Sequence, residues 1–384
     1  MPLRVLAISH PAVAAAYRRK FELIAREPGV QLRLIVPEAW REGTRLERFE
    51  AKNGCEWTVA LPVVWQDYYA RHMYRRGFAR QFDSFQPHIV HMEEEPFSLC
   101  AGQTLWTLRR RAPNARLIFR TSVGMRIRLK PIAAPLLRAV ERAVYRRASA
   151  AFALSETAAR FLRENGFQGE ARVFPNGVDT RIFRPLPAPE RKRLRLSFGA
   201  PPDAFIVGYA GQLIPEKGVD LLLHALAQTP NAYGLIVGAG REEAEMKALA
   251  ARLNLAERVR FTGSLKPQRV AEAMNAMDAL ALPSRTTPHW VEFFGRALIE
   301  AMACGAPVVG SDSGEIARVV DNAGLIVPEG DAAALADAIQ RLQNDPQLAA
   351  RLRENGQRRV QENYAWEKIA ADTAEAYRAA LDAP

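Results

Sequence analysis

Short apolar runs alternate with helical patterns along the whole chain. In the first half, the runs that predict strands cover residues 4–8, 31–36, 88–91, 115–120 and 150–153. Patterns with an apolar residue every three or four positions, such as residues 14–26 and 138–147, separate these runs and predict helices. An alternation of strands and helices is typical of a parallel sheet with helices on its faces.

The second half repeats the scheme. Its predicted strands are residues 205–209, 233–237, 259–262, 279–282, 307–310 and 324–327. A connection rich in proline lies between the halves and contains Pro185, Pro187, Pro189, Pro201 and Pro202. We therefore expect an α/β protein with two doubly wound domains, residues 1–185 and 190–365, that bind ligands at the carboxyl ends of their strands.

Composition supports a two-domain globular protein. The chain has 384 residues, of which 48% are hydrophobic and 25% are charged, so it can bury two cores and is not disordered. No apolar run approaches the roughly 20 residues that span a bilayer, and the start MPLRVLAISH resembles a strand more than a signal peptide. The three cysteines are far apart and the six histidines do not cluster. These features predict a cytoplasmic protein with reduced thiols and without a metal or cofactor.

Positive charge is concentrated in the first half. Residues 1–189 contain 31 Lys and Arg against 17 Asp and Glu, a balance of +14, whereas the rest has 22 against 25, a balance of −3. Basic residues interleave with Ile127 and Leu129 or recur at helical spacing, namely Arg126, Arg128, Lys130, Arg138, Arg142 and Arg146. Two interpretations remain open: a solvated arginine-rich surface, or peripheral association with an anionic membrane. Nucleic acid is disfavoured because no aromatic stacking platform accompanies the charge.

Two glutamates stand in an apolar segment, residues 290–305. Glu292 precedes Gly295, and Glu300 lies within a predicted helix, residues 296–303. A carboxylate among apolar neighbours needs hydrogen-bond donors, and the adjacent hydroxyls of a sugar supply them. Gly295 would allow close approach of a ligand, and the start of the helix offers N–H groups to a phosphate. The alternative is two solvated glutamates around a turn.

A second segment, residues 208–223, runs from a strand through a glycine-marked loop into a helix. Lys217 stands beside Gly218 at the helix entrance, where its ammonium can meet an anion that also contacts the helix N-terminus. The alternative is a surface lysine in a turn.

Together these segments resemble the donor-binding half of family 4 glycosyltransferases. The matching elements, in order, are residues 176–179 (Asn-Gly-Val-Asp), Phe183, Pro185, residues 211–218, 237–240, 259–263, 292–300, 306–309 and 314–315. The resemblance implies the GT-B fold, in which two Rossmann-like domains face each other across a cleft. It also implies that the C-terminal helix, residues 366–384, packs on the first domain. The implied reaction is retaining transfer of a sugar from a UDP- or GDP-sugar to an acceptor hydroxyl, for example on a lipid-linked or cell-envelope glycan.

The resemblance also implies roles for individual residues. Glu300 would bind the ribose, Glu292 the transferred sugar and Lys217 the diphosphate, with no metal required. Further donor contacts would come from Gly211, Gln212, Gly238, Gly240, Gly263, Phe294, Gly295, Arg296 and Ala297. Many members of the family carry an arginine where this chain has Gln212, so the second cation of the phosphate site is missing or comes from elsewhere.

The acceptor side is expected near residues 88–96. His91, Glu93 and Glu95 end a predicted strand, and in the family a histidine-containing strand end at this place faces the sugar. Together with Glu292 and Lys217, His91 is therefore a candidate catalytic residue. His10 and Arg120, at or just beyond the ends of two other strands, are further acceptor-side candidates. The alternative is a charged loop.

In a front-face mechanism, the leaving phosphate accepts the proton of the acceptor hydroxyl, and the configuration of the sugar is retained without a nucleophile from the protein. This mechanism fits the absence of an obvious nucleophile, and double displacement stays open. The sequence disfavours two other classes of protein. A nucleotide-dependent oxidoreductase or epimerase is disfavoured because no G-x-G-x-x-G follows the first strand. A non-catalytic protein of this fold that binds sugar or a membrane surface is disfavoured because Lys217, Glu292 and Glu300 are all present.

Overall fold

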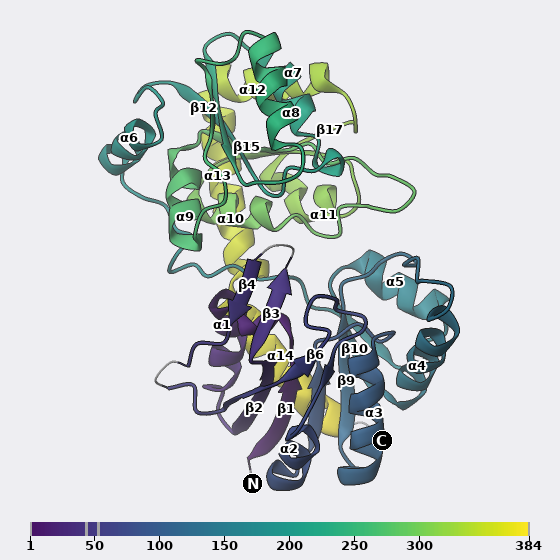
Figure 1. Ribbon diagram of the computed structural model, residues 1–384. Coiled ribbons are helices and arrows are strands. Elements are labelled where there is room, and N and C mark those ends of the chain that lie inside the picture. The colour runs from purple at the N-terminus through teal and green to yellow at the C-terminus, as the bar shows by residue number, and fades with distance from the viewer. Residues whose placement is uncertain (1, 43–44, 52–53, 383–384) are drawn as a thin grey trace. The chain divides into compact units, whose positions relative to one another are not determined.

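The structure, a computed structural model, describes residues 2–42, 45–51 and 54–382 (Figure 1). Its contacts divide the chain into two compact units. The first unit comprises Met1–Pro175 together with Trp366–Pro384, and the second comprises Asn176–Ala365.

A parallel sheet forms the centre of the first unit. Seven strands of its described residues pair in the order β11-β10-β9-β8-β1-β2-β5. Their bounds are β1 Leu3–Ile8, β2 Val30–Pro37, β5 Thr58–Leu61, β8 Ile89–Met92, β9 Arg116–Thr121, β10 Ala150–Ala153 and β11 Glu170–Val173. The chain runs from β1 through β2 to one edge and returns beside β1 as β8. The strand order therefore reverses between β1 and β8, which is where open α/β sheets bind ligands.

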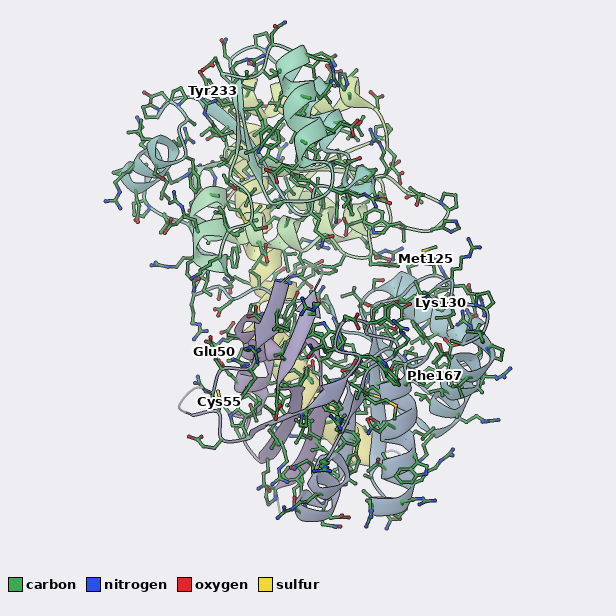
Figure 2. The ribbon with its side chains drawn as sticks, viewed as in Figure 1. Glu50, Cys55, Met125, Lys130, Phe167 and Tyr233 are labelled. Carbon is green, nitrogen blue, oxygen red and sulfur yellow. The ribbon has the colours of Figure 1, made fainter. Side chains whose placement is uncertain are left out.

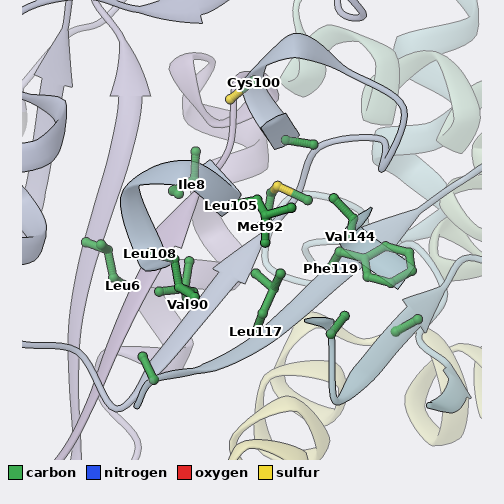
Figure 3. Close-up of a cluster of buried hydrophobic side chains, with 14 of the residues drawn as sticks. Leu6, Ile8, Val90, Met92, Cys100, Leu105, Leu108, Leu117, Phe119 and Val144 are labelled. Atoms are coloured by element: carbon green, nitrogen blue, oxygen red, sulfur yellow. The ribbon is translucent and has the colours of Figure 1, made fainter. Parts of the chain in front are cut away.

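Helices cover both faces of this sheet. They are α1 Ala15–Ile24, α2 Phe78–Phe85, α3 Leu99–Arg111, α4 Ala134–Arg147, α5 Glu156–Glu164 and α14 Trp366–Asp382, with a short 3-10 turn η1 at Pro11–Val13. Leu6 and Ile8 of β1 belong to one buried cluster, whereas Val5 and Ala7 belong to another, because alternate strand residues point to opposite faces. Figure 3 shows the first cluster, in which Leu108 of α3 lies beside Val90 of β8.

The C-terminal helix α14 completes the second cluster. Tyr377 and Ala370 of α14 are fully buried there with Phe21 of α1. Figure 1 shows α14 in yellow alongside the strands of the first sheet. The last helix is thus part of the core of the first unit, although it follows the second unit in the sequence.

The segment between β2 and α2 contains strands that the apolar pattern does not predict. β3 Ala39–Glu42 pairs antiparallel with β4 Arg45–Arg48, and β6 Val63–Val64 pairs antiparallel with β7 Met73–Tyr74. These strands are two to four residues long and mix polar with apolar positions. Runs this short carry no clear period, which is why the sequence did not reveal them.

The second unit has a parallel sheet of its own. Six strands of its described residues pair in the order β14-β13-β12-β15-β16-β17, with bounds β12 Phe205–Ala210, β13 Ala232–Val237, β14 Val259–Phe261, β15 Ala279–Leu282, β16 Val308–Ser311 and β17 Gly324–Val327. The order reverses between β12 and β15. Each strand predicted from an apolar run, in both units, forms within one residue of its expected bounds.

Helices also surround the second sheet. They are α6 Ala188–Ser197, α7 Val219–Ala227, α8 Glu243–Arg252, α9 Pro267–Ala276, α10 Arg296–Cys304, α11 Ile316–Val320, α12 Ala332–Asn344 and α13 Pro346–Arg359. Short turns of helix occur at η2 Pro215–Lys217, η3 Asp321–Ala323 and η4 Val360–Tyr364, the last of π type.

The boundary between the units differs from the expected one. The sequence placed it at residues 185–190, but the contacts place residues 176–185 in the second unit. The Val178 N–H donates to the Tyr364 carbonyl at 2.8 Å. Asn275 accepts from the Leu186 N–H at 2.8 Å and donates to the Arg184 carbonyl at 3.0 Å. These hydrogen bonds attach the proline-rich segment to the second unit, which proline content alone does not predict.

Candidate functional site

The candidate donor site lies at the carboxyl ends of β12 and β15. After β12 the chain passes through Gly211 and η2 to Gly218, whose φ of 66° is left-handed and whose added Cβ would lie 2.0 Å from the Pro283 carbonyl oxygen. Only glycine allows this approach of two backbones. It brings Lys217 beside the loop that follows β15.

Lys217 and Glu292 meet at this point. The Lys217 Nζ donates to Glu292 Oε2 at 2.5 Å, and the Ser284 Oγ donates to the same oxygen at 3.0 Å. Glu292 is buried, and the Lys217 Nζ also lies 5.1 Å from the centre of the Trp290 ring. The two residues that the sequence assigned to phosphate and sugar are therefore neighbours, and their opposite charges offset each other's burial.

Helix α10 begins next to this pair. Gly295 has a φ of 82° and stands immediately before Arg296, so the first N–H groups of the helix follow a left-handed turn. Phe294 is buried against Tyr364, with ring centres 5.7 Å apart. The start of a helix presents N–H groups that favour an anion.

Glu300 faces the same side of α10 as Arg296. The Arg296 guanidinium donates to Glu300 Oε1 at 3.2 Å, one helical turn away. Burial raises the pKa of the Glu300 carboxyl, and Arg296 opposes that shift only in part. A carboxyl group held where its charge is disfavoured is a typical feature of functional sites.

The glycines of the neighbouring loops pack against one another. An added Cβ on Gly238 would lie 1.8 Å from the Gly211 carbonyl oxygen, and one on Gly240 would lie 2.2 Å from that of Leu213. The Gly238 N–H donates to the Gly263 carbonyl at 2.9 Å. Close backbone packing thus accounts for two of these glycines without a ligand, and it places their loops against the segment from Gly211 to Leu213 that leads to Lys217.

Gln212 is exposed, as a residue that could reach a ligand must be. Its carbonyl accepts from the Tyr209 hydroxyl at 2.7 Å, which holds the backbone of the loop. Ala297, Arg296 and Glu300 are all half-buried at the start of α10. The structure therefore brings Lys217 and Glu292 into contact just before α10, and the other donor-side candidates lie in α10 or in loops of the same unit.

In the first unit, three consecutive carboxylates follow β8, and each has its own partners. Glu93 pairs with the buried Lys20 and accepts from Ser9 Oγ at 3.4 Å. Arg120 Nε lies 3.9 Å from Glu93 Oε1. The carboxylates are thus not an exposed charged loop.

Glu95 is held by the strand end of β9. It accepts from Thr121 Oγ1 at 2.5 Å, from the Ser122 N–H at 2.9 Å and from Ser122 Oγ at 2.7 Å. Burial raises the pKa of Glu95, and these hydrogen bonds oppose the shift. Glu95 therefore joins β8 to β9 at the carboxyl end of the sheet.

Glu94, which the sequence did not single out, binds two histidines. Its Oε1 accepts from the His10 N–H at 2.7 Å, its Oε2 lies 2.5 Å from His10 Nδ1, and His72 Nε2 lies 3.6 Å from Oε1. Burial alone would raise the pKa of Glu94, but the charges of His10 and His72 outweigh it and lower the pKa to about 2. No sequence spacing links His72 to this place, because it belongs to the segment between β6 and β7.

His91 lies in the core rather than at a surface that a ligand could reach. It is fully buried, its Nδ1 lies 2.5 Å from the Tyr377 hydroxyl of α14, and its ring packs against Phe152. Burial, together with the charges of Lys20 and Arg120, lowers the pKa of His91 well below its ordinary value. The expectation that His91 faces the sugar is therefore corrected: β8 points this side chain toward the face that α14 covers.

Known proteins resemble both units. Residues 14–177 match the glycosyl transferase 4-like domain, and residues 190–359 match the glycosyl transferases group 1 family. A GDP-mannose-dependent monoacylated alpha-(1-6)-phosphatidylinositol monomannoside mannosyltransferase of Corynebacterium glutamicum is 32% identical over 218 residues, 55% of this chain and 57% of that protein. A D-inositol 3-phosphate glycosyltransferase of Streptomyces bingchenggensis is 35% identical over 243 residues, 59% of this chain and 51% of that protein. The chain thus spans about half the length of these curated relatives.

Solved structures match over the full length. A sucrose-phosphate synthase from Thermosynechococcus elongatus superposes with a TM-score of 0.76 at 26% identity and covers 100% of both chains. The Anabaena protein HepE in complex with UDP gives a TM-score of 0.76 at 21% identity and covers 99% of this chain and 100% of that one. The expected GT-B fold is confirmed. The chain therefore belongs to the family 4 type of glycosyltransferases, with a glycosyl transferase 4-like domain followed by a glycosyl transferases group 1 domain.

Proposed function

We propose that the protein is a retaining glycosyltransferase that moves a sugar from a UDP- or GDP-sugar to an acceptor hydroxyl. The observation that carries this proposal is the convergence of Lys217, Glu292 and the start of α10 at one point, with Glu300 one turn into the helix. A cation and free helical N–H groups suit a diphosphate, and two carboxylates suit the hydroxyls of two sugars.

Glu292 can hold a sugar without giving up Lys217. Lys217 and Ser284 both donate to Oε2 of its carboxylate, so Oε1 is the oxygen that would accept from a sugar hydroxyl. Lys217 Nζ carries three N–H donors and can bind phosphate and Glu292 together. In this proposal Glu292 positions the sugar, and the leaving phosphate, stabilised by Lys217 and α10, accepts the proton of the acceptor hydroxyl. The donor site needs no metal for this chemistry.

The relatives support the choice of donor and the range of acceptors. One of them is named for GDP-mannose and for an acylated phosphatidylinositol monomannoside, and another for D-inositol 3-phosphate. These acceptors are a lipid-linked sugar and a small soluble phosphate. The acceptor of this chain is therefore proposed from its own surface.

A basic surface of the first unit favours a lipid-linked acceptor. Arg126, Arg128 and Lys130 are exposed in the segment between β9 and α4, and Figure 2 shows Lys130 at the same end of the unit as Met125. Ile132 is 94% exposed and Leu136 is 59% exposed. Exposed cations beside exposed apolar side chains are suited to an anionic membrane surface.

The interleaved apolar residues of this surface have another role than expected. Ile127 and Leu129 pack against a buried cluster with Val123 and Leu137, so they face inward. Ile132 and Leu136 take their place as the apolar side chains that could enter a bilayer. No helix in the described part of the chain is long and apolar enough to cross a membrane. We propose peripheral association at the cytoplasmic face, with a lipid-linked or cell-envelope glycan as acceptor.

A ligand screen tests the donor proposal. Thermal unfolding of the purified protein is measured with UDP, GDP, ADP and NAD, and the nucleotide sugars of the stabilising base are then incubated with the protein and analysed by mass spectrometry. We expect stabilisation by UDP or GDP and slow hydrolysis of one nucleotide sugar. Stabilisation by NAD alone would indicate an oxidoreductase or epimerase. Intact donors throughout the screen would indicate a binding protein of the same fold.

A further inference from the structure

Two histidines and a glutamate meet where the strand order of the first sheet reverses. His10 follows β1, Glu94 follows β8, and His72 stands just before β7. One ligand atom from each of the three residues lies within 4.8 Å of the others. His72 and Glu94 are fully buried side chains, and 17% of the His10 side chain is exposed. The sequence places these residues far apart, and only the fold assembles them.

The contacts of His72 determine which of its nitrogens carries the proton. Nδ1 lies 2.9 Å from the Tyr69 carbonyl oxygen. Because a carbonyl oxygen only accepts hydrogen bonds, Nδ1 must be the donor, and in neutral histidine Nε2 then has a free lone pair. Nε2 is buried and has no hydrogen-bond partner among the described residues. An orphaned buried nitrogen of this kind needs an explanation.

The Nε2 atom of His72 faces a carboxylate oxygen. His72 Nε2 and Glu94 Oε1 are 3.6 Å apart, which is longer than the roughly 2.7–3.2 Å of an N–H···O hydrogen bond. If His72 is neutral, two electron-rich atoms face each other in a buried place and need positive charge between them. Burial lowers the pKa of His72, but the charge of Glu94, together with Cys100, outweighs burial and raises the pKa, so a proton on Nε2 supplies that charge when no metal ion is bound. A bound metal ion would replace this proton. Zinc bonds of about 2.1 Å at the tetrahedral angle would hold two such ligand atoms roughly 3.4 Å apart. The separation therefore fits two ligands of one metal ion better than it fits a hydrogen bond.

We propose that His10, His72 and Glu94 form a zinc-binding site. The other ring nitrogen of His72 already donates to a backbone carbonyl, a contact that orients metal-binding histidines. Glu94 is held in place by the His10 N–H. Two imidazoles and one carboxylate suit zinc, whereas magnesium and calcium prefer oxygen ligands.

His10 is the ligand that must move. Its Nδ1 is 2.5 Å from Glu94 Oε2, which is closer than two ligands of one metal ion, so the ring shifts outward and carries its proton on Nε2 when zinc binds. Partial exposure of His10 leaves room for this shift and a path for the ion. Trp40 covers the site, with its ring centre 4.4 Å from that of His10 and 4.9 Å from that of His72. Three protein ligands leave a fourth position for water or a hydroxyl.

Calorimetry of the full chain tests the site without any donor or acceptor, so its outcome is independent of the proposed transferase function. The purification tag is removed, the protein is dialysed against a chelator and then against buffer, and ZnCl₂ is titrated in. We expect one zinc ion per chain. Glu94→Gln and His72→Gln should weaken binding by more than about tenfold, whereas His88→Gln, a histidine change elsewhere in the first unit, should bind as the parent does.

A second measurement uses the parent protein, so it tests the site even if the variants fail to fold. Cobalt(II) is added to the parent protein, and its visible absorption reports whether the ion has a four- or five-coordinate site. We expect strong d–d bands that zinc abolishes, and thermal stabilisation by zinc but not by MgCl₂ or CaCl₂. Absence of zinc binding to the parent, or equal binding by a folded His72→Gln variant, would overturn the proposal.

Discussion

Glu300 carries a negative charge that its buried position in the folded protein disfavours. It stands on α10 among buried neighbours, and one half-exposed arginine is the partner that accompanies it. Burial raises its pKa, which means that the folded protein holds this carboxylate at a cost in stability. Natural proteins keep such groups where a ligand needs them.

Neutralising Glu300 should therefore stabilise the protein. A raised folded pKa means that the folded state retains a proton that the unfolded chain releases, so stability falls as pH rises from about 4.5 through the folded pKa. The Glu300→Gln variant has no carboxyl group at this position, so it does not lose this stability as pH rises. We expect a higher thermal midpoint than the parent at pH 7.5 and equal midpoints near pH 4, measured by circular dichroism. A variant that is less stable than the parent at pH 7.5 would contradict this account.

Lys217 and Glu300 should each contribute to nucleotide binding. We expect Lys217→Ala and Glu300→Gln to weaken binding of the nucleotide diphosphate by about 1.5 to 3 kcal/mol, because each removes one contact to a charged group. Calorimetry measures the change, and Lys247→Ala, an exposed lysine of α8 in the same unit, is the matched control. If both variants bind as the parent does, the donor site lies elsewhere.

Gln212 stands where a cation would meet the diphosphate. We expect Gln212→Arg to tighten binding of the diphosphate product by about tenfold at low salt and to slow turnover through product release. The comparison variant is Gln228→Arg, which adds the same charge to the same unit at the end of α7. Equal affinity of Gln212→Arg and the parent would show that another residue already supplies the second positive charge.

At the scale of elements, the start of α10 depends on one left-handed residue. Gly295 has a φ of 82°, and an added Cβ would lie 2.8 Å from Leu298 Cδ1 and 3.0 Å from Leu282 Cδ2. Any other residue would meet both backbone strain and crowding there. This left-handed turn sets the direction in which the first N–H groups of α10 point.

Gly295→Ala should therefore lower both stability and nucleotide affinity. Gly330 offers a matched control in the same unit, because its φ is 78° but nothing lies within 4 Å of its added Cβ. We expect Gly330→Ala to cost about 1 to 2 kcal/mol from backbone strain alone. Gly295→Ala should cost more because of the added crowding. Urea unfolding and calorimetry measure both effects, and equal stability of the two variants would contradict the role of crowding.

At the scale of the whole molecule, the uneven charge of the chain suggests how it meets its acceptor. The +14 balance of residues 1–189 stands against −3 for the rest. Charges on an exposed surface act over roughly 8 Å at physiological salt, so any membrane attraction should be strongly salt-dependent.

Sedimentation with anionic vesicles tests this attraction. We expect the parent protein to sediment with vesicles at low salt and to be released as salt rises. Changing Arg126, Arg128 and Lys130 together to Ser should reduce binding, whereas changing Arg109, Arg110 and Arg111 of α3 to Ser removes the same charge from another surface and should reduce it less. Equal losses for the two triple variants would favour a nonspecific charge effect and a soluble acceptor.

The amino-acid sequence by itself determined the fold and the donor-side segments. Strands such as β12 and β15 are continuous apolar runs because both faces of a parallel sheet are buried, so their positions can be recognised locally. Glu292, Gly295 and Glu300 lie in one short segment, and their spacing around a helix start is visible without a structure.

Only the tertiary structure decided which side chains meet. Lys217 and Glu292 are 75 residues apart, His10 and Glu94 are 84 apart, and His91 and Tyr377 are 286 apart. Periodicity reports whether a residue is buried, but it does not report its partner, because the partner depends on which strands are neighbours in the sheet. The pairing of β1 with β8 places Glu94 at His10, and the return of α14 buries His91. His72 could not be predicted, because its position depends on the short, aperiodic strands between β2 and α2.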